Sequence, residues 1–179
     1  MSMSCAWTPD DREAYPAASA LYHDRLFQFP QAFTLNQQWL ERHPDDLAAL
    51  SDFAEKYLTT GRFAECDQRL TVLLANPEVT PQVRLALQAL EIANLLALDQ
   101  AALVPDKIDI MLVTLDQQPE DFRITWSFGG TLHFIGQQAS LTSYRDWLQQ
   151  FFDVLTATDR QALVTGLHAA QASFLAGVK

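Results

Sequence analysis

Four prolines, each followed directly by acidic residues, divide this chain at nearly regular intervals. Pro9, Pro44, Pro77 and Pro119 follow one another at distances of 35, 33 and 42 residues. Because proline ends one helix and acids favour the N-terminus of the next, this spacing predicts helix-turn-helix units stacked side by side. We therefore expect a single all-α domain. Its predicted parts are a flexible arm at 1–8, units at about 9–44, 45–77, 78–119 and 120–156, and a capping helix at 158–177.

The unit at 45–77 has the clearest helical pattern. Its apolar residues recur every three or four positions on both sides of Gly61, which predicts two antiparallel helices joined by a tight turn. Small residues are needed where two helices cross closely, so Ala54 and Cys66 are expected to face each other. The apolar positions are Leu47, Leu50, Phe53, Ala54, Tyr57 and Leu58 in the first helix, and Phe63, Cys66, Leu70, Leu73 and Leu74 in the second.

This unit resembles the tetratricopeptide repeat. The positions that match the family pattern are Leu50, Phe53, Ala54 and Tyr57 in the first helix, Gly61 in the turn, Cys66 and Leu70 in the second helix, and Pro77 at the close. Three of them depart from the usual residues, since Leu50 replaces Trp, Ala54 replaces Gly and Leu70 replaces an aromatic residue. The resemblance implies a right-handed superhelix of about four antiparallel helix pairs with a C-terminal capping helix.

The third unit and the C-terminal cap carry helix-start signals. Thr80 can cap a helix that begins at Pro81, and a longer connection leads to a second helix at about 106–117. Thr158 and Gln161 have the spacing of a capping box, which predicts a last helix over about 159–175.

The first and fourth units follow the pattern less regularly. Two prolines in the first unit predict an irregular entry near 9–16, a helix through Phe27 and another over about 30–42. In the fourth unit, Trp126, Gly129, Gly130, His133 and Phe134 suggest one helix, and apolar residues over 141–155 suggest its partner. Glycines in a helix are unfavourable, so the pair predicts close packing rather than a phosphate-binding loop, which would need a lysine.

The charge of the chain bears on its partners. The formal net charge is −10, and residues 1–120 hold 18 acids against 8 bases. Nucleic acid is not expected as a ligand because Lys and Arg do not cluster, and a basic protein segment fits better; the alternative is that the charge serves solubility. The longest strongly apolar run, at 92–98, is too short to span a membrane, and the N-terminus does not resemble a secretory signal, so we expect a cytoplasmic protein without membrane contact.

The sequence does not require catalysis, a cofactor or a metal. Cys5 and Cys66 are the two cysteines, too few for a disulfide framework or a thiolate metal site. His43, Asp45 and Asp46 could ligate a metal, but these acids already suit a helix start. We therefore predict no catalytic, cofactor-binding or metal-binding residues, and a metal-dependent or other hydrolase is the alternative from another class.

The resemblance directs attention to the first helix of each unit, which lines the concave groove in this family. By that correspondence, we expect a non-catalytic adaptor that binds a peptide or a helix in its groove. A small dedicated chaperone for a secreted or aggregation-prone bacterial protein is the alternative, and an uncovered apolar side of the first unit would favour a homodimer. The predicted partner-binding residues are Ser51, Glu55, Leu58, Thr59, Gln88, Ile92, Leu95, Ile124, Ser127, Thr131, Phe134 and Ile135.

Overall fold

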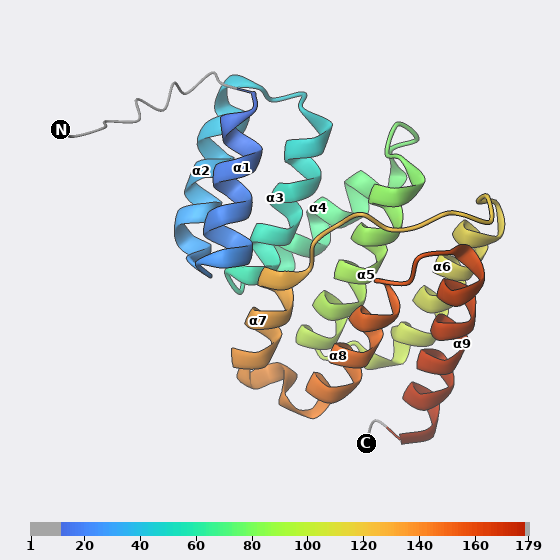
Figure 1. Cartoon of the computed structure of the whole chain (residues 1–179). Coiled ribbons are helices and arrows are strands. Elements are labelled where there is room, and N and C mark those ends of the chain that lie inside the picture. The colour runs from blue at the N-terminus through green and yellow to red at the C-terminus, as the bar shows by residue number, and fades with distance from the viewer. Residues whose placement is uncertain (1–11, 178–179) are drawn as a thin grey trace.

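The computed structural model describes residues 12–177, and every regular element in this range is a helix (Figure 1). The all-α class is therefore confirmed for the described part of the chain. The predicted arm at 1–8 and Cys5 lie outside the described residues. Within 12–177, no helix is long and apolar enough to cross a membrane.

The N-terminal helices differ in detail from the prediction. α1 (Ala14–Ala20) continues into a π-helical turn, η1 (Leu21–Arg25), and α2 (Phe29–Arg42) lies beside both. Pro16 does not keep its segment irregular, because it lies in the first turn of α1, where no backbone N–H is needed for the helix. Phe27 adopts a left-handed conformation with φ of 53° and reverses the chain between η1 and α2.

The second unit forms the predicted helix pair, α3 (Leu47–Thr59) and α4 (Phe63–Ala75). Asp46 caps α3 by accepting a hydrogen bond from the Ala49 amide at 3.0 Å, and Gly61 supplies the turn with φ of 73°. The Cys66 thiol lies 3.4 Å from the Ala54 carbonyl oxygen, to which it donates, and both residues are fully buried. The expected contact between the two small residues is confirmed.

The third unit holds α5 (Pro81–Ala97), a 3₁₀ turn η2 (Ala101–Leu103) and α6 (Val104–Asp116). Thr80 caps α5 as predicted, since its hydroxyl accepts from the Val83 amide at 3.4 Å. α5 is buried on most sides, as its wide apolar pattern indicates. It packs against α3, α4 and α6.

The fourth unit begins with a long connection instead of a helix. The chain is non-helical from 117 to 128, and α7 (Gly129–Gln137) starts only at the glycine pair. The prediction of one helix from Trp126 to Phe134 is therefore wrong in its first part. Every second residue here turns inward, since Phe122, Ile124 and Phe128 are buried and Trp126 is half-buried, which is the pattern of extended chain.

The remaining elements are η3 (Ala139–Tyr144), α8 (Arg145–Val154) and α9 (Arg160–Gly177). The predicted helix at 141–155 is thus divided into a 3₁₀ and an α segment. Asp159, rather than Thr158, caps α9, because its carboxylate accepts from the Ala162 amide at 2.8 Å.

The C-terminal helices fold back along the earlier ones (Figure 1). The connection at 117–128 crosses the molecule and brings α7 onto η1 and α3, while η3 contacts α5 and α9 contacts α6 and α8. Side chains from α2 to α9 share one hydrophobic core. The inner helices α3 and α5 are therefore covered by the chain itself.

Candidate functional site

The structure buries nearly all of the predicted partner-binding residues. Ser51, Glu55, Leu58, Thr59, Gln88, Ile92, Leu95, Ile124, Thr131, Phe134 and Ile135 are buried, and Ser127 is exposed. Thr131 on α7 contacts Glu55 on α3 directly, so α7 occupies the surface where the groove was expected. Gln88 instead donates to the Thr114 hydroxyl of α6 at 3.3 Å. Binding at these positions stays a prediction, and it requires α7 to move away from α3.

Glu55 accepts hydrogen bonds across this covered surface. The Thr131 hydroxyl donates to its Oε1 at 2.6 Å, and the Trp126 indole N–H donates to its Oε2 at 3.1 Å. Burial raises the pKa of Glu55, although the nearby His23 and Lys56 act in the opposite direction. A carboxyl group in this position therefore links α3 to the connection and to α7.

His23 joins η1 to the same surface. Its Nδ1 lies 2.8 Å from Asp24 Oδ1 and its Nε2 lies 3.2 Å from the Thr59 hydroxyl. The Gly130 amide, in the first turn of α7, donates to the same Asp24 oxygen at 2.9 Å. Burial alone would raise the pKa of Asp24, but the hydrogen bonds from His23 and Gly130 hold it below its ordinary value.

The glycine pair has the packing role that the sequence suggests. A Cβ at Gly130 would lie 2.3 Å from His23 Nδ1 and 2.7 Å from the His23 carbonyl oxygen. Since real Cβ atoms do not approach so closely, only glycine permits this contact between α7 and η1. Phe27 adds a stacking contact on His133 of α7, with ring centroids 3.9 Å apart.

Asp52 of α3 accepts a second group of hydrogen bonds. It accepts from the Lys56 ammonium, from the Tyr15 hydroxyl at 3.0 Å and from the Ser19 hydroxyl at 2.9 Å. Lys56 is only 2% exposed, so its charge depends on Asp52 for compensation. Burial and the adjacent Asp52 carboxylate raise the pKa of Tyr15. We call these side chains the buried polar cluster, which comprises Tyr15, Ser19, His23, Asp24, Asp52, Glu55, Lys56, Thr59, Trp126 and Thr131.

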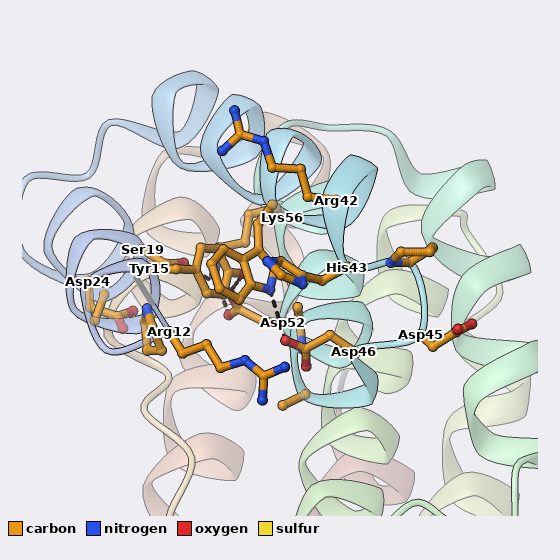
Figure 2. A pocket seen from close by; sticks show the side chains of 16 residues that line it. Arg12, Tyr15, Ser19, Asp24, Arg42, His43, Asp45, Asp46, Asp52 and Lys56 are labelled. Atoms are coloured by element: carbon orange, nitrogen blue, oxygen red, sulfur yellow. Dashed lines mark hydrogen bonds and ion pairs between the residues drawn. The ribbon is translucent and has the colours of Figure 1, made fainter. Parts of the chain in front are cut away.

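A cleft of about 740 Å³ opens beside the Asp52 end of this cluster (Figure 2). It lies between α1 and the turn that joins α2 to α3. One wall is aromatic, because Tyr15 and Trp39 stack with ring centroids 4.8 Å apart. The polar lining comprises Arg12, Tyr15, Ser19, Asp24, Arg42, His43, Asp45, Asp46, Asp52 and Lys56. We call this cavity the N-terminal cleft.

His43, Asp45 and Asp46, the side chains that could ligate a metal, line the N-terminal cleft, and two of them have other contacts. One Asp46 oxygen caps α3, and the other accepts from the Trp39 indole N–H at 2.8 Å. The His43 ring packs on Trp39 with centroids 4.1 Å apart. Among residues 12–177, no group of three or more His, Cys, Asp or Glu side chains could hold a metal ion. Asp46 therefore acts as a helix cap, in line with the helix-start interpretation.

Asp24, His23 and Thr59 follow one another in the order of a hydrolase triad, with a carboxylate on one ring nitrogen and a hydroxyl on the other. His23 and Thr59 are buried, however, and neither lines the N-terminal cleft. The Thr59 hydroxyl also donates to the Glu55 carbonyl oxygen at 3.2 Å, within its own helix. In this conformation a substrate in the cleft would reach Asp24 but not the hydroxyl.

The sequence predicted Glu55, Thr59 and Thr131 as partner-binding residues, but it did not predict that they would join a buried polar cluster with Asp24, Asp52 and Lys56. Asp52 and Lys56 have the i, i+4 spacing of a solvated ion pair, which is the ordinary interpretation of such residues. The available signal was their place in a helix whose other faces are apolar. The contact between Asp24 and Gly130 joins positions 106 residues apart, so no local pattern could predict it.

Comparison of the sequence and the structure with known proteins matched no family model, no curated protein and no solved structure.

Proposed function

We propose that this chain is a tetratricopeptide-like protein-binding module that acts without catalysis. The helix pairs α3–α4 and α5–α6 support the resemblance, since they lie within the predicted units and follow one another in contact. The close crossing at Ala54 and Cys66 and the turn at Gly61 match the positions on which the resemblance was based. The C-terminal helices distinguish this chain from an open array, because they cover α3 and α5.

The binding site that we propose is the N-terminal cleft, since the expected groove is covered. The observation that carries this proposal is that carboxylates from three elements line the cleft: Asp24 from η1, Asp45 from the turn before α3, and Asp52 from α3. Arg12, Arg42 and Lys56 line it as well, and Lys56 pairs with Asp52, so Asp45 at the exposed rim is the carboxylate that we propose meets the partner. The lowered pKa of Asp24 keeps that group ionised at neutral pH. The aromatic wall of Tyr15 and Trp39 offers apolar contact beside these charges. A lysine or arginine side chain of a protein partner fits this combination of groups.

Charge reversal at the cleft tests the proposal. A partner is first retained from native extract on the immobilised chain and identified by mass spectrometry, and its affinity and association rate are then measured at low and high salt. Asp45→Arg changes an exposed side chain at the rim of the cleft. We expect it to weaken binding about tenfold at low salt, mainly through slower association, and high salt to reduce the difference.

Asp153→Arg is the matched control, because it reverses an exposed charge on α8, away from the cleft. It should leave the affinity within about twofold of the wild type. Circular dichroism of both variants checks that they remain folded. Equal losses for the two variants would show that only the overall charge matters, and this outcome would remove the cleft from the proposal.

A further inference from the structure

α6 exposes apolar side chains on the face that points away from the core. Val104, Ile108, Met111 and Leu115 form its fully buried face. On the opposite face, Ile110 is 49% exposed and Val113 is 64% exposed, and Leu103, the residue directly before α6, is 44% exposed. Three large apolar side chains at positions that share a helical face make an uncovered ridge, which is unusual at the end of a stack of helices.

Acidic side chains border this ridge. Asp106 lies on the exposed face itself, and Asp109 and Asp116 follow the edge that faces α9. Lys107 does not offset them, because it is directed to α5, where its ammonium pairs with Glu91 at 2.6 Å. Arg160 of α9 also lines this surface, where its guanidinium donates to the carbonyl oxygens of Asp116 and Gln118, so three carboxylates face one cation. A partner on this surface therefore meets apolar contact and negative charge together.

The surface continues into a groove between α6 and α9. These two helices lie side by side at the opposite end of the molecule from α1 and α2 (Figure 1). The groove has a volume of about 420 Å³ and includes Leu112 and Val113 from α6 and Val164 and His168 from α9. It is separate from the N-terminal cleft, with which it shares no residue. We call the ridge and this groove together the α6 surface.

We infer that the α6 surface binds a cationic amphipathic helix of a partner protein. A helix of this kind has an apolar face that packs on Ile110 and Val113 and basic side chains that pair with Asp106 and Asp116. A second copy of this chain fits less well, since two α6 surfaces in contact would bring like charges together. This site is independent of the proposed use of the N-terminal cleft.

A synthetic peptide provides the probe. It has about 18 residues, long enough for a helix, and consists of leucines at three- and four-residue steps with lysines elsewhere. A peptide of the same composition with its leucines scrambled lacks the apolar face, and a third peptide carries glutamates in place of the lysines. We expect isothermal titration calorimetry to give one-to-one binding for the first peptide and at least tenfold weaker binding for the other two.

Paired variants localise the binding. Ile110→Ser with Val113→Ser should weaken binding about tenfold, whereas Val72→Ser, at a side chain of α4 that is 71% exposed, should leave it unchanged. Asp106→Asn with Asp116→Asn should weaken binding and reduce its salt dependence. The matched control for charge is Asp146→Asn with Asp153→Asn, which removes two exposed carboxylates from α8. Asp45→Arg, at the N-terminal cleft, should weaken peptide binding no more than Asp146→Asn with Asp153→Asn does.

Three results would overturn this inference. Binding of the scrambled peptide as tight as that of the amphipathic one would show attraction by charge alone. Equal effects of the α6 variants and their controls would place the site elsewhere. Sedimentation that shows a dimer of the wild type, lost on Ile110→Ser with Val113→Ser, would show that a second copy covers the α6 surface.

Discussion

Gly130 allows a sharp test of the packing between α7 and η1. Alanine normally stabilises a helix by about 1 kcal/mol relative to glycine. At Gly130, however, the added Cβ would meet the His23 ring at 2.3 Å and the His23 carbonyl oxygen at 2.7 Å. The second contact is with backbone, which a change of side-chain rotamer cannot relieve. Overpacking of this kind costs about 1–3 kcal/mol.

Movement of His23 adds to the cost. Its ring is hydrogen-bonded to Asp24 and Thr59, and loss of two hydrogen bonds destabilises by about 2 kcal/mol. After the helix preference is subtracted, Gly130→Ala should lower the free energy of unfolding by about 2–4 kcal/mol. For a chain of this length that corresponds to a fall in melting temperature of roughly 4–16 °C.

Gly136 in the same helix is the matched control. A Cβ there meets nothing within 4 Å, so Gly136→Ala should raise the free energy of unfolding by up to about 1 kcal/mol. Urea titrations followed by circular dichroism at 222 nm measure both changes. If Gly130→Ala proves as stable as Gly136→Ala, the close contact with His23 does not exist and α7 does not lie on η1 as described.

Three further predictions concern buried ionisable groups. Burial raises the pKa of Glu55 above its ordinary value of 4.5. The contribution of Glu55 to stability is therefore complete below pH 4.5 and is lost as the pH rises through the raised pKa. Glu55→Gln should make urea midpoints less dependent on pH above 4.5. The pKa of Asp24 lies below 3.8 because its hydrogen bonds outweigh burial, so its contribution to stability is present above pH 3.8 and is lost on acidification. Asp24→Asn should therefore make the urea midpoint fall less steeply as the pH is lowered. An unchanged pH dependence would contradict the lowered pKa of Asp24. Burial raises the pKa of the Cys66 thiol, so in a Cys5→Ser background a disulfide reagent at neutral pH should react only as fast as the protein unfolds, and rapid reaction of the folded protein would show an accessible thiol.

Local patterns were sufficient for the parts of the fold that depend on local chemistry. The turn at Gly61, the cap at Thr80 and the contact of Ala54 with Cys66 each follow from residue types at fixed spacing, and each was confirmed. The error at Trp126 came from the choice of period. Residues 122–128 alternate apolar and polar side chains, a two-residue period that indicates extended chain, but the glycines beyond them suggested a helical repeat.

The candidate site was much less predictable than the helices. The expected groove depends on inner helices that stay open, whereas the contact between Glu55 and Thr131 joins residues 76 positions apart. Such a contact is set by the path of the connection at 117–128, which no periodicity specifies. The N-terminal cleft likewise combines η1, α3 and the turn between α2 and α3, so its lining residues surround one cavity only in the folded chain.

The buried polar cluster explains why α7 lies where it does. Apolar packing is not directional and would accept α7 on α3 in several registers. Hydrogen bonds are directional, and a buried carboxylate left without donors is costly. Glu55 requires the Trp126 and Thr131 donors at the same time, and Asp24 requires the Gly130 amide, so a shift of α7 by one residue would leave both carboxylates short of partners. The buried polar cluster therefore fixes the position of α7, the helix that covers the expected groove. The groove could open only if α7 moved away from α3 and Glu55 and Asp24 lost these hydrogen bonds.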